Sequence, residues 1–252
     1  MIDLHCHLMP GVDDGAASLD VSIQMLSDAA QLNISAVCVT PHYSEIIGSA
    51  YERRFRWLVK QTAGQPIRLL RGMEYRYSDL LTLDEFVTLG DSSYILVDFV
   101  APAIDLSNVE KKVMELEHDG YKMVAAHPER LFGPQDIPAL QRLVKCGVIM
   151  QLNAGSFLGM HGVEVKQMAE LMLSYGLCHV VASDSHGKPT RTLFIDKAIN
   201  YFNSNYHKDA VQILFHENSQ LIIDDEHPHS IIPTVSHRSF NLIRRMFGPR
   251  IT

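Results

Sequence analysis

The chain has 252 residues, of which 46% are hydrophobic and 20% charged, and its formal net charge is -7. This composition is typical of a soluble globular protein and excludes disordered and fibrous classes, while the negative charge disfavours broad contact with nucleic acid. No run approaches the roughly 20 apolar residues that cross a bilayer, and the N-terminus has no signal-peptide pattern. We therefore expect a cytoplasmic protein that is not embedded in a membrane and binds no nucleic acid.

Short β-branched runs alternate with amphipathic segments along the chain, as in βα units around a parallel sheet. Ser18 and Ser107 are each expected to cap a helix, and another helix is predicted over Val163–Leu173. Three glycines fall where helices should end: Gly120, Gly147 and Gly176. Seven nearly continuous apolar runs predict strands that are covered on both faces. These strands are Ile2–Leu4, Ile34–Val39, Ile67–Leu70, Tyr94–Val97, Met123–Ala126, Val148–Leu152 and Val180–Ala182.

No linker, repeat or low-complexity tract interrupts this series, so we predict one domain over residues 1–252, with about seven βα units up to residue 225. The tail, residues 233–252, differs because it places arginines beside apolar side chains. Its arginines are Arg238, Arg244, Arg245 and Arg250. A short helix that docks a partner is one interpretation, and a solvated basic face is the commoner one.

Histidines and acids follow six of the predicted strands. They occur in His5-Cys6-His7, Thr40-Pro41-His42, Gly72-Met73-Glu74, Asp98, His127-Pro128-Glu129-Arg130 and Ser183-Asp184-Ser185-His186. The carboxyl ends of parallel strands meet on one rim of a barrel, so these side chains should lie together. On a regular strand His5 and His7 share one face with Asp3, and the two imidazoles can bind one ion. Mixed imidazole and carboxylate donors suit manganese, iron or zinc.

These motifs, in this order, resemble the polymerase and histidinol phosphatase (PHP) superfamily, and within it the bacterial CpsB/YwqE-type tyrosine-protein phosphatases. The likeness is strongest over residues 1–16, continues through Gln151-Leu152-Asn153-Ala154-Gly155-Ser156, and extends to about residue 225. It implies a distorted (βα)7 TIM-like barrel that holds two or three metal ions. The implied ligands are His5, His7, Asp14, His42, Glu74, Asp98, His127, Asp184 and His186. Asp98 departs from the family pattern, which has Glu there, and its shorter side chain leaves the ion count open.

The resemblance implies hydrolysis of protein phosphotyrosine by metal-activated hydroxide, with Arg130 and Arg191 holding the phosphoryl oxygens. No cysteine is followed six residues later by arginine, so the Cys-x5-Arg loop of cysteine-dependent tyrosine phosphatases is absent. The implied substrate is a bacterial tyrosine autokinase that controls capsule or exopolysaccharide synthesis. Mn²⁺ is the favoured cofactor, with Fe, Zn, Co and Mg left open, and a homo-oligomer is compatible with the sequence.

Several alternatives stay open at this point. The chain could instead be a PHP phosphoesterase for a small molecule or nucleotide, such as histidinol phosphate or an oligonucleotide end, or a non-catalytic PHP scaffold. Asp13 and Asp14 fit either an ordinary Asp-Asp-Gly turn or a ligand position, and the resemblance favours Asp14 as a ligand. Asp3 and Glu129 are candidates for orienting the ligands from behind.

Overall fold

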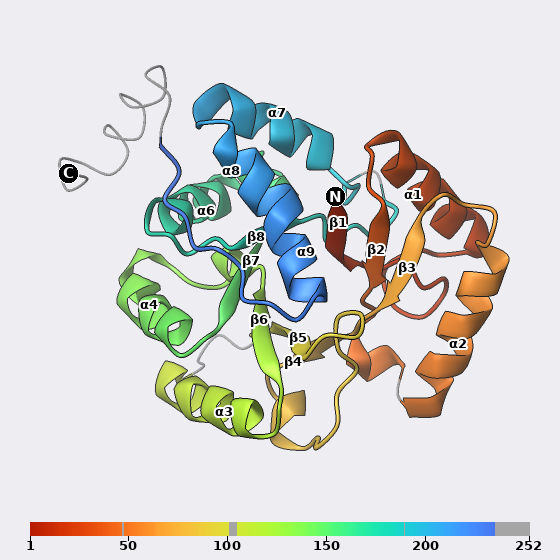
Figure 1. Ribbon diagram of the computed structural model, residues 1–252, viewed down its shortest axis with the longest axis horizontal. Helices are drawn as coiled ribbons and strands as arrows, with labels where there is room; N and C mark the ends of the chain where they lie inside the picture. Colours follow the sequence, from red (N-terminus) through yellow and green to blue (C-terminus); the bar gives the residue numbers. More distant parts are fainter. Residues whose placement is uncertain (47, 101–104, 189, 235–252) are drawn as a thin grey trace.

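Strands occupy the centre of the molecule and helices surround them, as the computed structural model shows (Figure 1). The structure describes residues 1–46, 48–100, 105–188 and 190–234. The strands are β1 (Ile2–Cys6), β2 (Ala36–Val39), β3 (Arg68–Arg71), β4 (Glu74–Arg76), β5 (Tyr94–Asp98), β6 (Lys122–Ala126), β7 (Ile149–Asn153) and β8 (Val180–Ala182). The α-helices are α1 (Leu19–Gln31), α2 (Gly48–Gln61), α3 (Leu106–His118), α4 (Ile137–Lys145), α5 (Ala154–Phe157), α6 (Val163–Ser174), α7 (Ile195–Asn205), α8 (Asp209–Gln212) and α9 (Asn218–Ile223). Short turns of 3-10 helix are η1 (Tyr43–Glu45), η2 (Asp79–Leu81), η3 (Pro128–Arg130) and η4 (Pro134–Asp136), and η5 (Ile213–Glu217) is π-helical.

The strands pair in parallel and fall into two sheets that meet at both ends. One sheet has the order β1-β2-β3 and the other β4-β5-β6-β7-β8. A bridge between Cys6 and Ser185 joins β1 to the chain just after β8, and a bridge between His42 and Glu74 joins the chain after β2 to β4. The pairings therefore run round in a ring, as in a distorted βα barrel. The α/β fold with parallel sheets that the sequence predicts is confirmed.

The third predicted strand is present, and a short strand that the sequence did not predict follows it. The strand predicted over Ile67–Leu70 is β3, and β4 begins three residues after β3 ends, at Glu74. β3 pairs with β2 and β4 pairs with β5, so the two pieces together act as one strand of the ring. The break lies at Gly72, where an added Cβ would lie 2.7 Å from Thr40 Cγ2. A glycine allows this close approach, and the chain changes partner there.

Apolar side chains fill the inside of the ring toward the N-terminal ends of the strands. This inner cluster includes Leu4, Cys38, Tyr94, Leu96, Val124, Ala126, Ile149 and Val180. Ile222 of α9 belongs to the same cluster and Ile223 packs against it, so α9 closes this end of the ring (Figure 1). A second cluster lies between the strands and the outer helices. Both layers keep the N-terminal end dry and leave the other end for polar groups.

The ends of the helices mostly follow the prediction. The Ser18 side chain accepts a hydrogen bond from the backbone N of Val21 and so caps α1. The cap predicted at Ser107 is wrong, because the Asp105 carboxylate caps α3 by accepting from the backbone N of Ser107. The three glycines predicted at helix ends have positive φ angles of 86°, 94° and 70°, a region that favours glycine: Gly120, Gly147 and Gly176.

The docking helix predicted for residues 233–252 is not tested, because residues 235–252 lie outside the described residues. The last described helix is α9, which ends at Ile223, close to the predicted end of the βα series. Among the described residues, no helix has both the length and the apolar character needed to cross a membrane.

Candidate metal centre

A β-bulge in β1 brings His5 inward. Asp3 pairs with Val37 and Cys6 pairs with Val39, so β1 has one residue more than β2 over this stretch. An extra residue shifts the alternation of side chains by one position. Leu4 therefore lies in the inner apolar cluster, its neighbour His5 also reaches the inside, and Cys6 packs in the outer cluster.

The regular strand face predicted for Asp3, His5 and His7 is absent for the same reason. Asp3 carboxylate oxygens accept hydrogen bonds from the backbone N of Ser183 at 3.0 Å and from its hydroxyl at 2.5 Å. A longer contact of 3.5 Å reaches the backbone N of His5, and the imidazole ring has another partner. Asp3 thus ties the end of β8 to β1 and does not orient the His5 ring.

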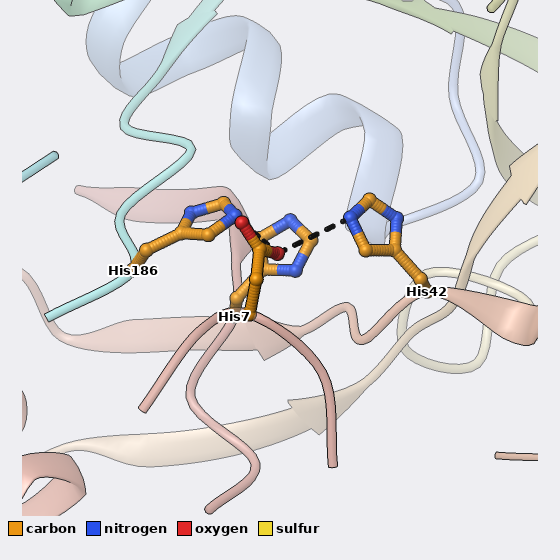
Figure 2. Close-up of side chains that lie close together, drawn as sticks. His7, His42 and His186 are labelled. Atoms are coloured by element: carbon orange, nitrogen blue, oxygen red, sulfur yellow. Dashed lines mark ion pairs between the residues drawn. The ribbon is translucent and has the colours of Figure 1, made fainter. Parts of the chain in front are cut away.

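Eight of the nine predicted ligands converge in three overlapping groups, within each of which the candidate donor atoms lie within 4.8 Å of one another. The groups are His7, Asp14, His42 and His186; His5, His7 and Asp184; and His5, Glu74 and His127. Figure 2 shows the rings of His42 and His186 on either side of the His7 ring. The His7 ring centroid lies 4.6 Å from that of His42 and 3.9 Å from that of His186. Asp14 Oδ1 lies 3.2 Å from His186 Nε2 and 3.5 Å from His42 Nε2.

Each ring of the His5 and His7 pair has one nitrogen held by a neighbour. Gln151 Oε1 lies 3.0 Å from His5 Nδ1, and Asp13 Oδ2 lies 2.7 Å from His7 Nδ1. An oxygen acceptor at Nδ1 favours the tautomer with its hydrogen there, which leaves a lone pair on Nε2. The two Nε2 atoms lie 3.1 Å apart, close to the roughly 3.3 Å expected for two nitrogens that bind one ion tetrahedrally. The pair is therefore oriented to share a cation.

The sequence did not indicate the supporting roles of Asp13 and Gln151, although Asp13 was weighed there as a turn or ligand residue. Asp13 also accepts hydrogen bonds from the backbone N of Gly15 at 3.0 Å and of His42 at 3.1 Å. It therefore fixes His7 and the start of η1 while its neighbour Asp14 enters a ligand group. The Asp-Asp-Gly turn was visible in the sequence, but the partner of its first carboxylate was not. Gln151 lies on β7, and nothing in one sequence pairs it with β1.

Gly15 holds the loop after β1 against the centre. A Cβ added there would lie 2.3 Å from His7 O and 2.4 Å from His7 Cβ. The next residue, Ala16, donates its backbone N to His7 O at 3.0 Å. Only a residue without a side chain allows this approach, which places Asp13 and Asp14 beside the histidines.

Glu74 lies among the histidines and is almost fully buried. Its Oε1 lies 3.1 Å from His127 Nε2, and its Oε2 lies 3.0 Å from His42 Nδ1 and 3.2 Å from His7 Nε2. Neither Oε2 nor His186 Nε2 has a partner with hydrogen-bond geometry. A buried polar atom left so costs about 1–3 kcal/mol, and divalent cations in the first and third groups would satisfy these two atoms. Their nitrogen and oxygen chemistry suits Mn²⁺, Fe²⁺ or Zn²⁺.

The buried carboxylates stay ionised beside the histidines. Burial acts to raise the pKa of Glu74, but the charge of His5 and a hydrogen bond from His127 hold that pKa well below its usual range. Burial acts in the same way on Asp184, and His5 and His7 again lower the pKa. Burial acts to lower the pKa of His127, but Glu74 and Asp184 raise it to about 9. Cation binding would replace these protons, because ligand histidines must be neutral.

Two of the ligand candidates have strained backbone. φ is +34° at His127 and +51° at Asp184, in the left-handed region that non-glycine residues rarely adopt. The backbone N of Asp184 donates to His5 O at 2.9 Å, which holds this conformation in place. Such strain costs about 1–3 kcal/mol and persists where the surrounding structure fixes it. His127 follows β6 directly and Asp184 lies two residues beyond the end of β8, both at the polar end of the ring.

Both predicted phosphate-binding arginines lie beside Asp184. Arg130 Nη1 donates to Asp184 Oδ2 at 3.1 Å, and Arg191 Nη2 lies 2.9 Å from both Asp184 oxygens. Arg191 Nη1 also donates to Asp14 Oδ2 at 3.2 Å. The side chains of Arg130 and Arg191 are 35% and 24% exposed, against 2% for Asp184. The two guanidinium groups thus lie between the buried ligands and solvent, where an incoming anion meets them first.

Asp98 joins none of the three groups found among the described residues. It is the last residue of β5, where it pairs with Arg76, and its side chain is half-buried. Burial raises the pKa of its carboxyl, and the nearby charge of His127 acts in the opposite direction. Asp98 therefore lies near the third group without sharing its close contacts.

Glu129 supports the centre from behind. One of its oxygens accepts from the backbone N of Asn153 at 3.0 Å and from Ser156 Oγ at 2.7 Å. Asn153 Nδ2 in turn donates to Asp184 Oδ2 at 2.9 Å. Glu129 thus contacts Asp184 indirectly, through Asn153 at the end of β7. This agrees with the supporting role expected for Glu129.

Solved structures share this architecture. One chain from the crystal structures of YwqE from Bacillus subtilis and CpsB from Streptococcus pneumoniae, described as unique metal-dependent tyrosine phosphatases, has a TM-score of 0.82 and 28% identity to this chain. The match covers 94% of this chain and 100% of that one. The phosphotriesterase from Mycobacterium tuberculosis, at a TM-score of 0.56 and 9% identity over 91% of this chain and 94% of that one, shares the fold alone.

Sequence comparisons point to the same group. The tyrosine-protein phosphatase YwqE of Bacillus subtilis is 29% identical over 239 residues, which cover 90% of this chain and 92% of that protein. The tyrosine-protein phosphatase CpsB of Streptococcus pneumoniae is 26% identical over 243 residues, which cover 90% of this chain and 99% of that protein. The family model for capsular polysaccharide synthesis, CpsB/CapC, matches residues 1–224. The chain therefore belongs to the CpsB/CapC family of capsular polysaccharide synthesis proteins.

Proposed function

We propose that this chain is a metal-dependent protein-tyrosine phosphatase whose active site is the cluster at the C-terminal end of the strand ring. The observation that carries the proposal is the convergence of eight predicted ligands in three overlapping groups beside two arginines. The names of the relatives support the same activity, since YwqE and CpsB are tyrosine-protein phosphatases and the solved relative is metal-dependent.

The ring nitrogens limit how ions can distribute over the three groups. His5 and His7 each offer one free nitrogen, and each belongs to two groups. Two ions can fill the first and third groups without sharing a donor. A third ion between His5 and His7 would leave the third group with Glu74 and His127, and Asp98 is the nearby carboxylate that would complete it. We propose that Asp98 determines whether the site binds two or three ions, and that the bound metal is Mn²⁺.

The chain's own groups then prepare the phosphoryl transfer. Bound divalent ions would polarise the phosphoryl group and lower the pKa of a water molecule at the site. Arg130 and Arg191 would bind the non-bridging phosphoryl oxygens with their planar forks. Asp13 and Gln151 keep the rings of the histidine pair in the ligand tautomer. The departing tyrosine phenolate, with a solution pKa of about 10, needs little help from an acid.

We propose a phosphotyrosine protein as the substrate, and specifically a bacterial tyrosine kinase of polysaccharide export. The family's description as capsular polysaccharide synthesis supports this choice. We also propose a cytoplasmic location and a single phosphatase domain over residues 1–252, of which the family match spans residues 1–224.

A comparison of substrates tests the activity. Phosphotyrosyl peptide, histidinol phosphate and short oligonucleotides are offered to the Mn²⁺-loaded protein, and kcat/KM is measured for each. We expect the peptide to be the best substrate, and we expect the His5→Ala variant to lose the activity on it. Fast turnover of histidinol phosphate or an oligonucleotide beside poor turnover of the peptide would overturn the proposal.

A further inference from the structure

A basic groove lies beside the metal centre and takes no part in the chemistry proposed above. It is a hollow of about 500 Å³ between the loop after β1, η1 and one face of α2. We call it the α2 groove and define it by the residues that the argument uses: Val12, Glu45, Ala50, Arg53, Arg54 and Trp57.

The walls of the α2 groove begin at the metal centre. Val12 precedes the ligand candidate Asp14 by two residues, and Glu45 follows His42 by three. Arg191 Nη1 donates to Asp14 Oδ2 at 3.2 Å. A phosphoryl group held by Arg191 therefore lies next to this loop. Residues that flank the phosphotyrosine of an extended segment can then enter the groove.

α2 turns a basic face to the groove. Its lining residues follow the spacing of one helix face: Ala50, Arg53, Arg54 and Trp57. The other face packs into the core through Tyr51, Phe55 and Leu58. The helix carries four basic residues and one acidic residue in its sequence GSAYERRFRWLVKQ, although the whole chain has a net charge of -7. This local reversal of charge suits a negatively charged partner.

The two groove arginines keep most of their hydrogen-bonding capacity. Arg53 Nη1 donates to Ser49 Oγ at 3.1 Å and Arg54 Nη2 donates to Pro10 O at 3.4 Å, and neither arginine forms an ion pair with a carboxylate in the described part of the chain. Glu45 is the single acidic residue among the described lining residues. Each guanidinium has five N–H donors, so both can receive carboxylates from a partner.

Trp57 gives the groove an aromatic wall. Its side chain is 39% exposed, and Arg54 Cζ lies 6.0 Å from the ring centroid. Tryptophan and arginine are the residue types most enriched where binding energy is concentrated. Trp57 is also the only tryptophan in the chain, so its fluorescence reports on this groove and on no other site.

We propose that the α2 groove binds acidic residues flanking the phosphotyrosine of a protein segment, so that the enzyme selects acidic phosphotyrosine sequences. This inference rests on the proposed phosphatase activity and names the class of substrate. The groove supplies two guanidinium groups beside one aromatic ring, which matches a short acidic segment better than a long polyanion.

The test compares two phosphotyrosyl peptides of equal length with the Mn²⁺-loaded protein, one with glutamates around the phosphotyrosine and one with glutamines. We expect kcat/KM to be about fivefold higher for the acidic peptide, as two exposed ion pairs allow. Arg53→Gln/Arg54→Gln should bring the ratio near one. The matched control is Arg56→Gln/Lys60→Gln, which removes the same charge from α2 outside the groove and should keep the ratio.

A charge-reversal variant distinguishes a change in peptide preference from simple loss of folding. Arg53→Glu/Arg54→Glu should prefer a lysine-flanked peptide over the acidic one, and a misfolded protein cannot gain such a preference. A non-hydrolysable acidic phosphonate peptide should change Trp57 fluorescence. Equal turnover of both peptides by the unaltered protein would overturn the proposed role of the α2 groove. So would an equally large fall in the acidic-to-neutral ratio of kcat/KM in the control variant. Failure to hydrolyse either peptide would instead overturn the proposed activity.

Discussion

The two ends of the strand ring are built from the same strands and hold opposite kinds of side chain. At the N-terminal end, Leu4, Leu96 and Val124 pack with Ile222 of α9 in an apolar cluster. At the C-terminal end the same strands lead into histidines, carboxylates and strained backbone. We infer that the closed apolar end stabilises the fold. This stability allows the open end to hold buried polar groups and strained backbone that lower the free energy of unfolding.

The largest expected effect comes from the polar end. Asp184→Ala removes the carboxylate that both arginines contact and that the second ligand group needs. We expect kcat/KM on phosphotyrosyl peptide to fall at least about 1000-fold, the scale for losing a central electrostatic group. Steady-state assays and circular dichroism measure activity and folding together.

A matched control lies at the opposite end of the ring. Asp225 also pairs with a basic residue, because its Oδ1 lies 3.2 Å from Lys122 Nζ. Asp225→Ala should leave kcat/KM within about twofold, as expected for an exposed ion pair. A comparable loss of activity in both variants would contradict the division between the two ends.

The second effect comes from the apolar end. Leu96→Ala leaves a cavity in the inner cluster, where Leu96 is fully buried. We expect the free energy of unfolding in urea to fall by about 2–5 kcal/mol. At temperatures where the variant stays folded, kcat/KM should change little. Loss of activity without loss of stability would show that the inner layer does more than support the fold.

A smaller effect is expected from the residue behind His5. Gln151→Ala removes the oxygen that lies 3.0 Å from His5 Nδ1, so the ring can turn and change tautomer. Metal affinity should fall about 10–100-fold, measured by titration with Mn²⁺, and excess metal should restore turnover. Gln135→Ala, at an exposed glutamine, is the control. Unchanged affinity after Gln151→Ala would show that His5 is held by other contacts.

The smallest effect concerns His179, a buried histidine near the apolar end. Burial lowers the pKa of His179 to about 4, and its Nδ1 accepts from the backbone N of Met150 at 3.0 Å. In the unfolded chain a histidine has a pKa of about 6.5. Below about pH 6.5 the unfolded chain binds a proton at this histidine, whereas the folded protein binds it only near pH 4. The free energy of unfolding therefore falls as the pH drops from about 6.5 to 4.

This linkage should cost about 1 kcal/mol between pH 7.5 and 5.5. His179→Gln keeps an acceptor for Met150 and removes the titration, so its free energy of unfolding should fall less over the same range. Parallel curves for the variant and the unaltered protein would show that His179 does not contribute.

Much of the apolar half could be predicted from the sequence, because periodic apolar runs and helix-ending glycines act locally. Departures from regular strands could not be predicted in this way. The change of partner between β3 and β4 depends on Gly72 approaching Thr40, and the bulge in β1 depends on pairing with β2. Asp105 caps α3 in place of Ser107, since either side chain can cap and only the start of the helix decides.

The candidate ligands could be predicted and their supports could not. His7 and Asp14 were named because they stand in a motif after a strand, and the structure brings them into one group. Asp13 and Gln151 act through contacts that form only when distant strands meet. Asp98 lies outside the three groups found among the described residues, and its role in the ion count stays a prediction.

The most direct test of the central claim is the metal content of the protein together with its activity. Protein purified without added metal is analysed for its elements, then chelated, assayed on phosphotyrosyl peptide, and assayed again after Mn²⁺ is returned. We expect at least two ions per chain before chelation, loss of activity on chelation and recovery with Mn²⁺. Full activity in chelated protein that contains no divalent metal would contradict the account.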